Sequence, residues 1–372
     1  MKPPNDVLII NSYAGSLTIA ASQLGLPIRG SYEDCGFGLP VQRANFPDLK
    51  YIEKPPWPKD HLHHSLVIAH PPCAAFSTQS PYRKGIDSDH FLPHKMVMDY
   101  ALSQGAPALA IESVPGILAA GRQVHEEFAK KYKYNVFYIH QNAVTFGVPQ
   151  WRPRVWTIFT KLPQLILHHY PNIRRVRDIL LRKGTTLEPN AEIRDAVKCL
   201  VGAGFTEKRI YKELLSGEHI GSLLQIGKKL LDIDDPGPNY QEVRDRWNLG
   251  GRFGVKLPRV LNPEEFGTTI LHDSSFFVMG RELYLEEYCA LMGFPGDYKW
   301  PGRTLRDFRL YLSKGVCPPV AKWILEMMQI NTSKTVRLAD LDAVTSMVRV
   351  VKPGEVADFT VTKKQVKQGR LF

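Results

Sequence analysis

Residues 65–77 read Ser-Leu-Val-Ile-Ala-His-Pro-Pro-Cys-Ala-Ala-Phe-Ser, and this stretch constrains the possible folds more than any other. A short apolar run that ends at two prolines is typical of a buried parallel strand, because proline lacks the amide that continues a β-ladder. Cys73 then lies on a stiff loop at the carboxyl end of a strand, where open α/β sheets bind their ligands. Two interpretations stay open: Cys73 is a nucleophile, or it is a small buried apolar side chain.

The N-terminal segment predicts the same class of sheet. Residues 7–10 are an apolar run that enters a small-residue turn, and a helix is expected over 19–25. A strand, a turn and a helix in this order form the first unit of a Rossmann-like sheet, in which backbone amides approach a bound cofactor. The next predicted strand ends near Glu33. An acidic side chain there commonly accepts hydrogen bonds from ribose hydroxyls, and a solvated loop charge is the alternative.

Two later strands carry charged side chains at their ends. Residues 108–113 form an apolar strand that ends at Glu112, so we expect this carboxyl group at the same sheet edge as Cys73. Further along, Arg152 and Arg154 precede a strand over 155–159, and β-alternation puts them on one face. Paired arginines suit the recognition of a carboxylate or a phosphate. An exposed pair at the start of a strand is the other interpretation.

Composition limits the classes of protein and partner. The chain has 372 residues, enough for a large α/β domain and a smaller second one. Its formal net charge of +11 favours a polyanionic partner, although charge also serves solubility. The five cysteines are scattered and include no Cys-x-x-Cys pair, so we expect neither a metal site nor a disulfide framework. No apolar run reaches the roughly 18 to 20 residues of a membrane span, so we expect no membrane partner.

The order of the motifs resembles the DNA cytosine-5 methyltransferase family. The motifs are Pro-Pro-Cys, then Glu-x-Val-Pro-Gly, then Gly-Val-Pro-Gln-x-Arg-x-Arg; residues 281–298 and 318–321 are similar to the family's ninth and tenth motifs. The resemblance covers about residues 1–160 and 262–330. It implies an α/β fold, a Rossmann-like class I methyltransferase domain with an inserted smaller target-recognition domain. The expected parts are a catalytic and cofactor-binding domain (1–160), a target-recognition domain (161–261), a return to the catalytic domain (262–330) and a C-terminal basic extension (331–372).

The resemblance also implies roles for single residues. Cys73 would attack C6 of a flipped cytosine, and Glu112 would supply the proton or hydrogen bond at N3. Arg152 and Arg154 would orient the base, the carboxylate or a phosphate. The methyl donor would be S-adenosylmethionine, and the residues expected beside it are Tyr13, Ala14, Gly15, Ser16, Glu33, Pro71, Ser313, Lys314 and Val316.

The expected partner is double-stranded DNA, bound by a monomer in the cytoplasm of a prokaryotic cell or a phage-infected host. Two other functions stay open, a tRNA cytosine methyltransferase and an inactive reader of modified bases. In the region 161–261, residues 204–215 vaguely resemble a helix-turn-helix, and residues 250–254 are a Gly-rich loop. In the tail, residues 347–351 predict a strand.

Several positions depart from the family pattern. The first motif has Asn11 where the family has Asp, and residues 69–70 are Ala-His where the family has Gly-Gly. The tenth motif has Ser313 and Lys314 where the family has Gly-Asn. Because an ammonium beside a sulfonium is repulsive, an anionic donor would compensate. The candidate is carboxy-S-adenosylmethionine, which would give 5-carboxymethylcytosine. Alternatively, Lys314 faces solvent, pairs with a local acid or contacts a DNA phosphate.

Overall fold

The computed structural model describes residues 4, 6–33, 36, 38–59, 61–78, 80, 84–182, 259–270, 276–278, 281–301, 305–332 and 347–360. The chain forms two compact units. Residues 1–173, 292–294 and 315–372 form the first, and residues 174–291 and 295–314 form the second. The predicted helix-turn-helix (204–215) and Gly-rich loop (250–254) lie outside the described residues. The assignment of residues 161–261 to target recognition therefore stays a prediction.

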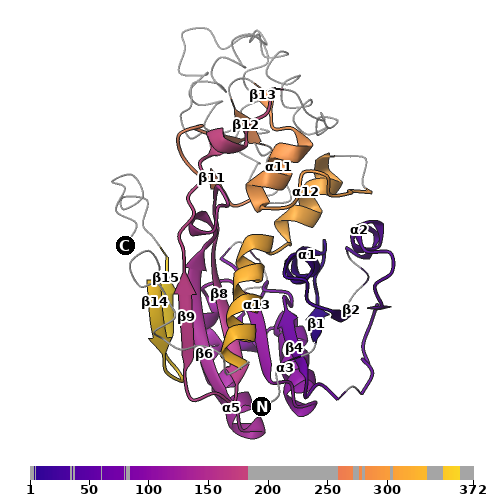
Figure 1. The fold of residues 1–372 in the computed structure, drawn as a ribbon, viewed down its shortest axis with the longest axis vertical. Coiled ribbons are helices and arrows are strands. Elements are labelled where there is room, and N and C mark those ends of the chain that lie inside the picture. The colour runs from indigo at the N-terminus through magenta and orange to yellow at the C-terminus, as the bar shows by residue number, and fades with distance from the viewer. Residues whose placement is uncertain are drawn as a thin grey trace, which may run out of the picture. The chain divides into compact units, whose positions relative to one another are not determined.

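The first unit contains an eight-stranded sheet in the order β15-β6-β8-β5-β4-β1-β2-β3 (Figure 1). Strand β8 runs antiparallel to both of its neighbours, β5 and β6, whereas the other neighbouring strands are parallel. This confirms the predicted α/β class with a Rossmann-like sheet. The strands are β1 (Asp6–Ile10), β2 (Ile28–Tyr32), β3 (Tyr51–Ile52), β4 (Ser65–Ala69), β5 (Ala108–Ser113), β6 (Asn135–Asn142), β8 (Pro153–Thr160) and β15 (Val356–Phe359).

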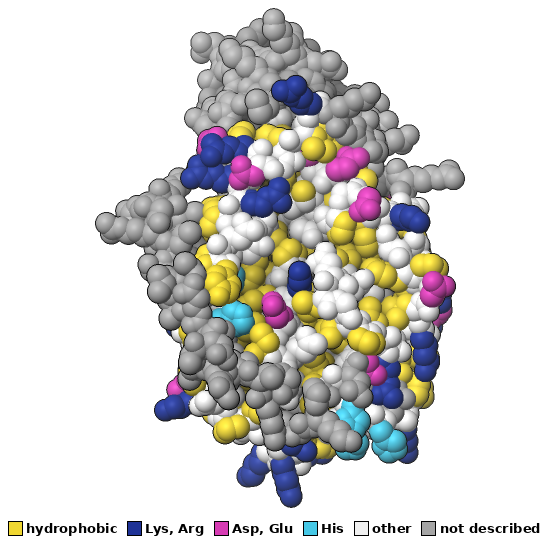
Figure 2. Space-filling view, viewed as in Figure 1, with side chains coloured by type: hydrophobic (Ala, Val, Ile, Leu, Met, Phe, Trp, Pro, Cys, Tyr) yellow, Lys and Arg dark blue, Asp and Glu magenta, His cyan; other side chains and the backbone are white. Residues whose placement is uncertain are grey.

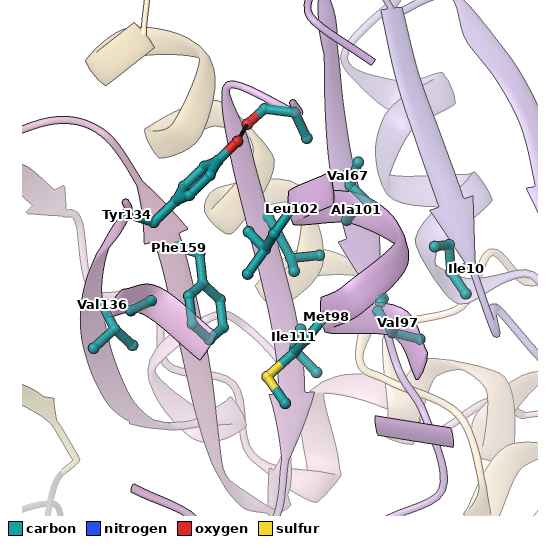
Figure 3. Close-up of a cluster of buried hydrophobic side chains, with 14 of the residues drawn as sticks. Ile10, Val67, Val97, Met98, Ala101, Leu102, Ile111, Tyr134, Val136 and Phe159 are labelled. Carbon is teal, nitrogen blue, oxygen red and sulfur yellow. Dashed lines mark hydrogen bonds between the residues drawn. The ribbon is translucent and has the colours of Figure 1, made fainter. Parts of the chain in front are cut away.

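Helices cover the sheet, which explains why the central strands are continuous apolar runs. Every residue of β4 and β5 is buried, as expected of strands covered on both faces. Figure 3 shows Val97, Met98, Ala101 and Leu102 of α3 packed against sheet residues such as Ile111. Contacts of α13 with α1, β4 and β5 cover other parts of the sheet. The helices are α1 (Ser16–Gln23), α2 (Leu39–Asn45), α3 (Leu92–Ser103), α4 (Ile117–Ala120), α5 (Arg122–Tyr132) and α13 (Pro318–Thr332).

The strand order reverses between β1 and β4, and this point positions the site. The chain builds β1, β2 and β3 in one direction and β4 and β5 in the other. Ile10 at the end of β1 pairs with Ala69 at the end of β4, which in turn pairs with Ile111 of β5. The loops that follow these strands therefore leave the same edge side by side. Ligands of open α/β sheets bind at such a reversal.

The C-terminal residues add strands to the first unit. The predicted strand over 347–351 is confirmed as β14 (Met347–Val351), which pairs antiparallel with β9 (Leu165–His169). The sequence did not indicate β15, which pairs parallel with β6 at the edge of the large sheet. Arg122 donates a hydrogen bond to the carbonyl oxygen of Gly354 (2.6 Å) and fixes the turn before β15. The described part of this extension thus belongs to the first unit's sheets.

The second unit is described in short elements. The hydroxyl of Tyr288 accepts a hydrogen bond from the amide of Phe276 (2.8 Å), and Glu287 accepts one from the amide of Leu181 (2.6 Å). The short elements after residue 173 are η4 (Val176–Ile179), β10 (Arg259–Val260), β11 (Gly267–Thr268), β12 (Phe276–Val278), β13 (Arg281–Glu282), α11 (Leu285–Met292) and α12 (Leu305–Ser313). The short elements before it, in the first unit, are η1 (Gly85–Asp87), η2 (Asp89–Phe91), η3 (Ala143–Thr145) and β7 (Gln150–Trp151).

The surface of the described residues carries charges of both signs (Figure 2). On the face that Figure 2 shows, the Lys and Arg side chains of the described residues are scattered among acidic and hydrophobic ones. Net charge alone therefore does not locate a DNA-binding surface on this face. Among the helices that the structure describes, none has the length and apolarity needed to cross a bilayer.

A buried histidine pair between α3 and α5 makes stability depend on pH. The Nε2 atoms of His94 and His125 lie 3.1 Å apart, and both residues are buried. Burial lowers the pKa of His125 to about 3, and burial followed by the charge of His125 lowers the pKa of His94. The unfolded chain titrates near the ordinary value of 6.5 and so binds more protons than the folded state below that pH. Stability should fall as pH drops from about 6.5 towards 3.

At pH 5, burial of neutral His125 should lower the free energy of unfolding by about 2 kcal/mol. This pH lies about 1.5 units below the ordinary pKa of 6.5, and each unit corresponds to about 1.4 kcal/mol. Urea unfolding at pH 7 and pH 5 measures this loss. His125→Gln should show a loss smaller by about that amount, and His64→Gln, at an exposed histidine, should keep the wild-type loss. Equal losses in wild type and His125→Gln would contradict the prediction.

Candidate active site

The loop after β4 holds Cys73 in a fixed turn. The amide of His70 donates to the carbonyl oxygen of Ile10 (3.1 Å), which extends the ladder one residue beyond β4 before the two prolines end it. The carbonyl oxygen of Cys73 then accepts hydrogen bonds from the amides of Phe76 (3.0 Å) and Ser77 (3.1 Å). Cys73 itself is partly buried and forms no disulfide. Cys73 therefore lies in the loop at the carboxyl end of β4, as the sequence predicted.

Glu112 lies at the centre of the site. Its Oε2 is 3.0 Å from Nε2 of His70, and its Oε1 is 2.9 Å from Nε of Arg154. The sheet explains the second contact: Glu112 of β5 is opposite Trp156 of β8, and Arg154 lies two residues along, on the same face. With only 1% of its surface exposed, Glu112 can hold a charge only because these two cations face it.

The groups at the site shift one another's proton affinities. Burial would raise the pKa of Glu112, but the charges of His70 and Arg154 hold it below its ordinary value. Burial would lower the pKa of His70, yet the Glu112 carboxylate and a hydrogen bond with Cys73 raise it to about 9. At neutral pH the two therefore form an imidazolium–carboxylate pair.

The same imidazolium acts on the thiol. Burial would raise the pKa of Cys73, but the hydrogen bond and the charge of His70, and then the charge of Arg154, lower it. A lowered thiol pKa raises the fraction of thiolate, which is the nucleophilic form. The site therefore favours a reactive cysteine over an inert apolar one.

The two arginines make different contacts. Arg152 is 2% exposed, and its Nη2 donates to the carbonyl oxygen of Gly315 (2.6 Å), just before α13. Burial and then the charge of Arg154 lower the pKa of Arg152 to about 10, so it keeps its proton at neutral pH. Arg154 instead faces Glu112. The sequence predicted both arginines on one face of the strand. Their partners lie on different segments, Gly315 before α13 for Arg152 and Glu112 of β5 for Arg154.

The loop after β1 adopts a strained backbone. Asn11 (φ 56°), Tyr13 (φ 49°) and Gly15 (φ 86°) are left-handed, a conformation that costs a non-glycine residue about 1–3 kcal/mol. The hydroxyl of Ser12 accepts hydrogen bonds from the amides of Leu17 (3.1 Å) and Thr18 (3.4 Å) at the start of α1. Strain of this kind persists only where surrounding contacts hold it, and it gathers at ligand sites.

Contacts from β2 and α2 hold this loop. Buried Glu33 accepts hydrogen bonds on Oε1 from the amide of Ser12 (3.1 Å) and from Nε2 of Gln42 (2.7 Å). Gln42 also donates to the carbonyl oxygen of Tyr13 (2.9 Å). A Cβ at Gly38 would lie 2.2 Å from that oxygen, so only glycine permits this approach. Glu33 therefore supports the loop directly, and its contact with a ribose stays a prediction.

Several of the residues predicted to bind the donor come together in the first unit. Tyr13 and Ala14 are buried in the loop, and Ser16 is buried at the start of α1, where its Oγ accepts a hydrogen bond from the amide of Val316 (3.2 Å). Pro71 is buried in the adjoining Cys73 loop. Left-handed backbone, the start of α1 and a buried carboxylate are a set that fits a nucleoside-type donor such as S-adenosylmethionine.

Ser313 and exposed Lys314 belong to the second unit, so their place beside the donor stays a prediction. Sequence reasoning missed the roles of His70 and Gln42. A histidine at the end of the strand that carries the cysteine was the available signal for His70. In the part of the chain that the structure describes, no cluster of three or more His, Cys, Asp or Glu side chains could hold a metal ion.

Comparisons with known proteins agree with this arrangement. The model of the C-5 cytosine-specific DNA methylase family matches residues 11–329. The type II methyltransferase M.AquIA of a Picosynechococcus species is 29% identical over 155 residues, which are 36% of this chain and 60% of that protein. The match thus spans less than two thirds of that relative's length.

Solved structures share the fold at low identity. A candidate DNA modification methyltransferase encoded within an E. coli prophage has a TM-score of 0.56 at 15% identity, covering 87% of this chain and 98% of that one. The Entamoeba histolytica methyltransferase EhMeth has a TM-score of 0.54 at 13% identity, covering 88% and 98%. Because the family model matches nearly the whole length, the chain belongs to the C-5 cytosine-specific DNA methylase family.

Proposed function

We propose that this protein is a DNA methyltransferase that transfers a methyl group from S-adenosylmethionine to C5 of a cytosine flipped out of double-stranded DNA. The observation that carries the proposal is the convergence of Cys73, Glu112 and Arg154 at one edge of the sheet. A thiol with a lowered pKa beside a buried carboxyl group is the pair that covalent attack on a cytosine ring requires.

The chemistry assigns a role to each of these side chains. The Cys73 thiolate adds to C6, which makes C5 nucleophilic, and N3 of the ring takes a proton. Glu112 gives that proton, and Arg154 orients its carboxyl group. The donor, when bound, supplies the electrophilic methyl group. After transfer, the C5 proton leaves to solvent water, the C6–S bond breaks, N3 returns its proton to Glu112, and Cys73 becomes a thiolate again.

The donor would lie against the loop of residues 13–16 and Val316. Arg152 supports this place indirectly, because it binds Gly315, the residue before Val316. Glu33 would face the ribose, and Pro71 would line the side nearer the cysteine. The target base would come from the edge where the Cys73 loop ends, because a base within a duplex cannot reach this partly buried thiol.

A second donor follows from Lys314. It is exposed and directly precedes Gly315 and Val316, which contact Arg152 and Ser16. Consecutive Cα atoms are about 3.8 Å apart, so the chain tethers the backbone of Lys314 to Gly315. This tether supports carboxy-S-adenosylmethionine as an alternative donor, with 5-carboxymethylcytosine as the product.

Trapping and mass spectrometry test both parts. With S-adenosylmethionine present, wild type should form a covalent adduct with 5-fluorocytosine DNA, because C5 then carries no proton to eliminate; Cys73→Ser should form none, and Cys289→Ser, which removes another thiol, should still form it. Tight DNA binding without an adduct would indicate a reader of modified bases, and a preference for tRNA in competition would indicate a tRNA enzyme.

Nucleoside mass spectrometry with each donor then identifies the transferred group. A carboxymethyl product that Lys314→Asn loses would establish Lys314 as the donor-selecting cation. If only 5-methylcytosine forms, with a donor preference that Lys314→Asn leaves unchanged, the carboxylated donor is excluded.

A further inference from the structure

His70 occupies a fixed place between the two loops of the site. Its amide is bonded to Ile10, its side chain is buried, and the ring of Tyr13 packs edge-on against it with centroids 5.3 Å apart. The two prolines that follow stiffen the same segment. The imidazole is therefore held in one position rather than free to turn towards solvent.

This imidazole bridges the nucleophile and the acid. Nε2 of His70 lies 3.0 Å from Oε2 of Glu112, and the same imidazole, three residues before Cys73 on one loop, lowers the pKa of the Cys73 thiol through a hydrogen bond and its charge. The two partners need opposite proton changes: the thiol must lose a proton before attack, and Glu112 must gain one before it can give it to the base. A single side chain in contact with both can serve both needs.

We propose that His70 carries the thiol proton of Cys73 to Glu112, which delivers it to N3 of the cytosine as sulfur bonds to C6. This proposal rests on the proposed function. Cys73 first gives its S–H proton to the imidazole, so the resting site holds a thiolate and an imidazolium. In the step, the S–C6 bond forms, an N–H bond of the imidazolium breaks towards Glu112, and the electron pair of C5=C6 moves to make C4=C5. The C4=N3 pair moves onto N3, which takes the proton. Protons and electrons balance without any external base.

The charged groups around His70 fit this role. The Glu112 carboxylate faces it from β5, the Cys73 thiol from its own loop and the Tyr13 phenol ring from the loop after β1. Arg154 and Arg152 act on the carboxylate from the segment that begins β8. In the resting site the proton lies on the imidazole, and two guanidinium groups limit how strongly Glu112 attracts it.

Alkylation of the thiol tests the first half without DNA or donor. Iodoacetamide labelling of Cys73, followed by peptide mass spectrometry from pH 5 to 10, gives the thiol pKa. His70→Gln should move this profile upward by at least one pH unit and slow labelling at pH 7 about tenfold. His64→Gln, an exposed histidine on the segment before β4, should label as wild type does. An unchanged Cys73 profile in folded His70→Gln would overturn the proposal.

A cation that does not release its proton separates charge from proton transfer. His70→Lys should keep Cys73 labelling at pH 7 close to wild type, because an ammonium also stabilises the thiolate. Its single-turnover rate on cytosine DNA should stay at least about tenfold low at pH 7, because the ordinary pKa of a lysine ammonium, about 10.4, lies well above that of an imidazole, about 6.5, so lysine gives up its proton less readily. Full turnover by His70→Lys would show that charge alone suffices and would overturn proton carriage.

The two proposals fail in different ways. If the proposed function is wrong, wild type forms no adduct with 5-fluorocytosine DNA, whatever the labelling shows. If only the role of His70 is wrong, wild type forms the adduct and His70→Gln forms it at the same rate at every pH. Thermal unfolding of each variant establishes that it is folded before either comparison.

Discussion

Glu112→Gln should lower kcat for cytosine transfer by about 10²–10⁴, the range of a lost general acid. Glutamine keeps the shape of the side chain but cannot give a proton to N3. It also removes the carboxylate that raises the pKa of His70, so burial then lowers that pKa and the imidazole loses its proton at neutral pH. The thiolate of Cys73 loses its neighbouring cation, and two catalytic requirements fail together.

Stability should change in the same variant. Breaking a buried ion pair costs about 3–5 kcal/mol, and deprotonation of His70 returns part of this, which leaves Arg154 as the unpaired cation. Steady-state kinetics and urea unfolding measure the two effects. Glu126→Gln, at an exposed pair with Arg122, is the matched control. It should leave kcat close to wild type and change the free energy of unfolding by no more than about 0.5 kcal/mol. A Glu112→Gln enzyme with near wild-type kcat would contradict the role of this residue.

Local patterns were sufficient to locate the nucleophile and the acid. Apolar runs mark β4 and β5, two prolines end one and Pro115-Gly116 follows the other, and parallel strands place their ends at one edge. Cys73 and Glu112 could therefore be placed together from the sequence. His70 could not, because its contact with Glu112 depends on the register that pairs Ala69 with Ile111. No local pattern states that register.

The turn after β1 shows a different limit. Only Gly15 signalled a left-handed turn, yet Asn11 and Tyr13 also adopt that backbone. The contacts that hold them come from Glu33 and Gln42, about 20 to 30 residues away in the sequence, and propensity cannot anticipate such support. Strand β15 was missed for a similar reason. Its four residues alternate in burial only because the edge of β6 is there to receive them.

The second large effect concerns Arg152 and Arg154. Substitution of the first should affect stability and donor binding, whereas substitution of the second should affect kcat. Arg152→Met removes the charged donor to Gly315 and should reduce the free energy of unfolding by about 3 kcal/mol, as for a lost buried charged hydrogen bond. It should also weaken donor binding at least about tenfold, because Gly315 precedes Val316, which is bonded to Ser16. Methionine keeps most of the volume, so the loss reports the contact rather than a cavity.

Arg154→Met should instead lower kcat about 10²-fold or more, with donor affinity within twofold of wild type, because Arg154 orients the carboxyl group that meets the base. Donor affinity by calorimetry, single-turnover rates and urea unfolding distinguish the two variants. If both lower kcat alike and leave donor binding intact, Arg152 acts on the base with Arg154, as their shared face in the sequence suggested. If the patterns cross as expected, the family's arginine pair divides its work here: Arg152 fixes the segment before α13, and Arg154 serves the reaction.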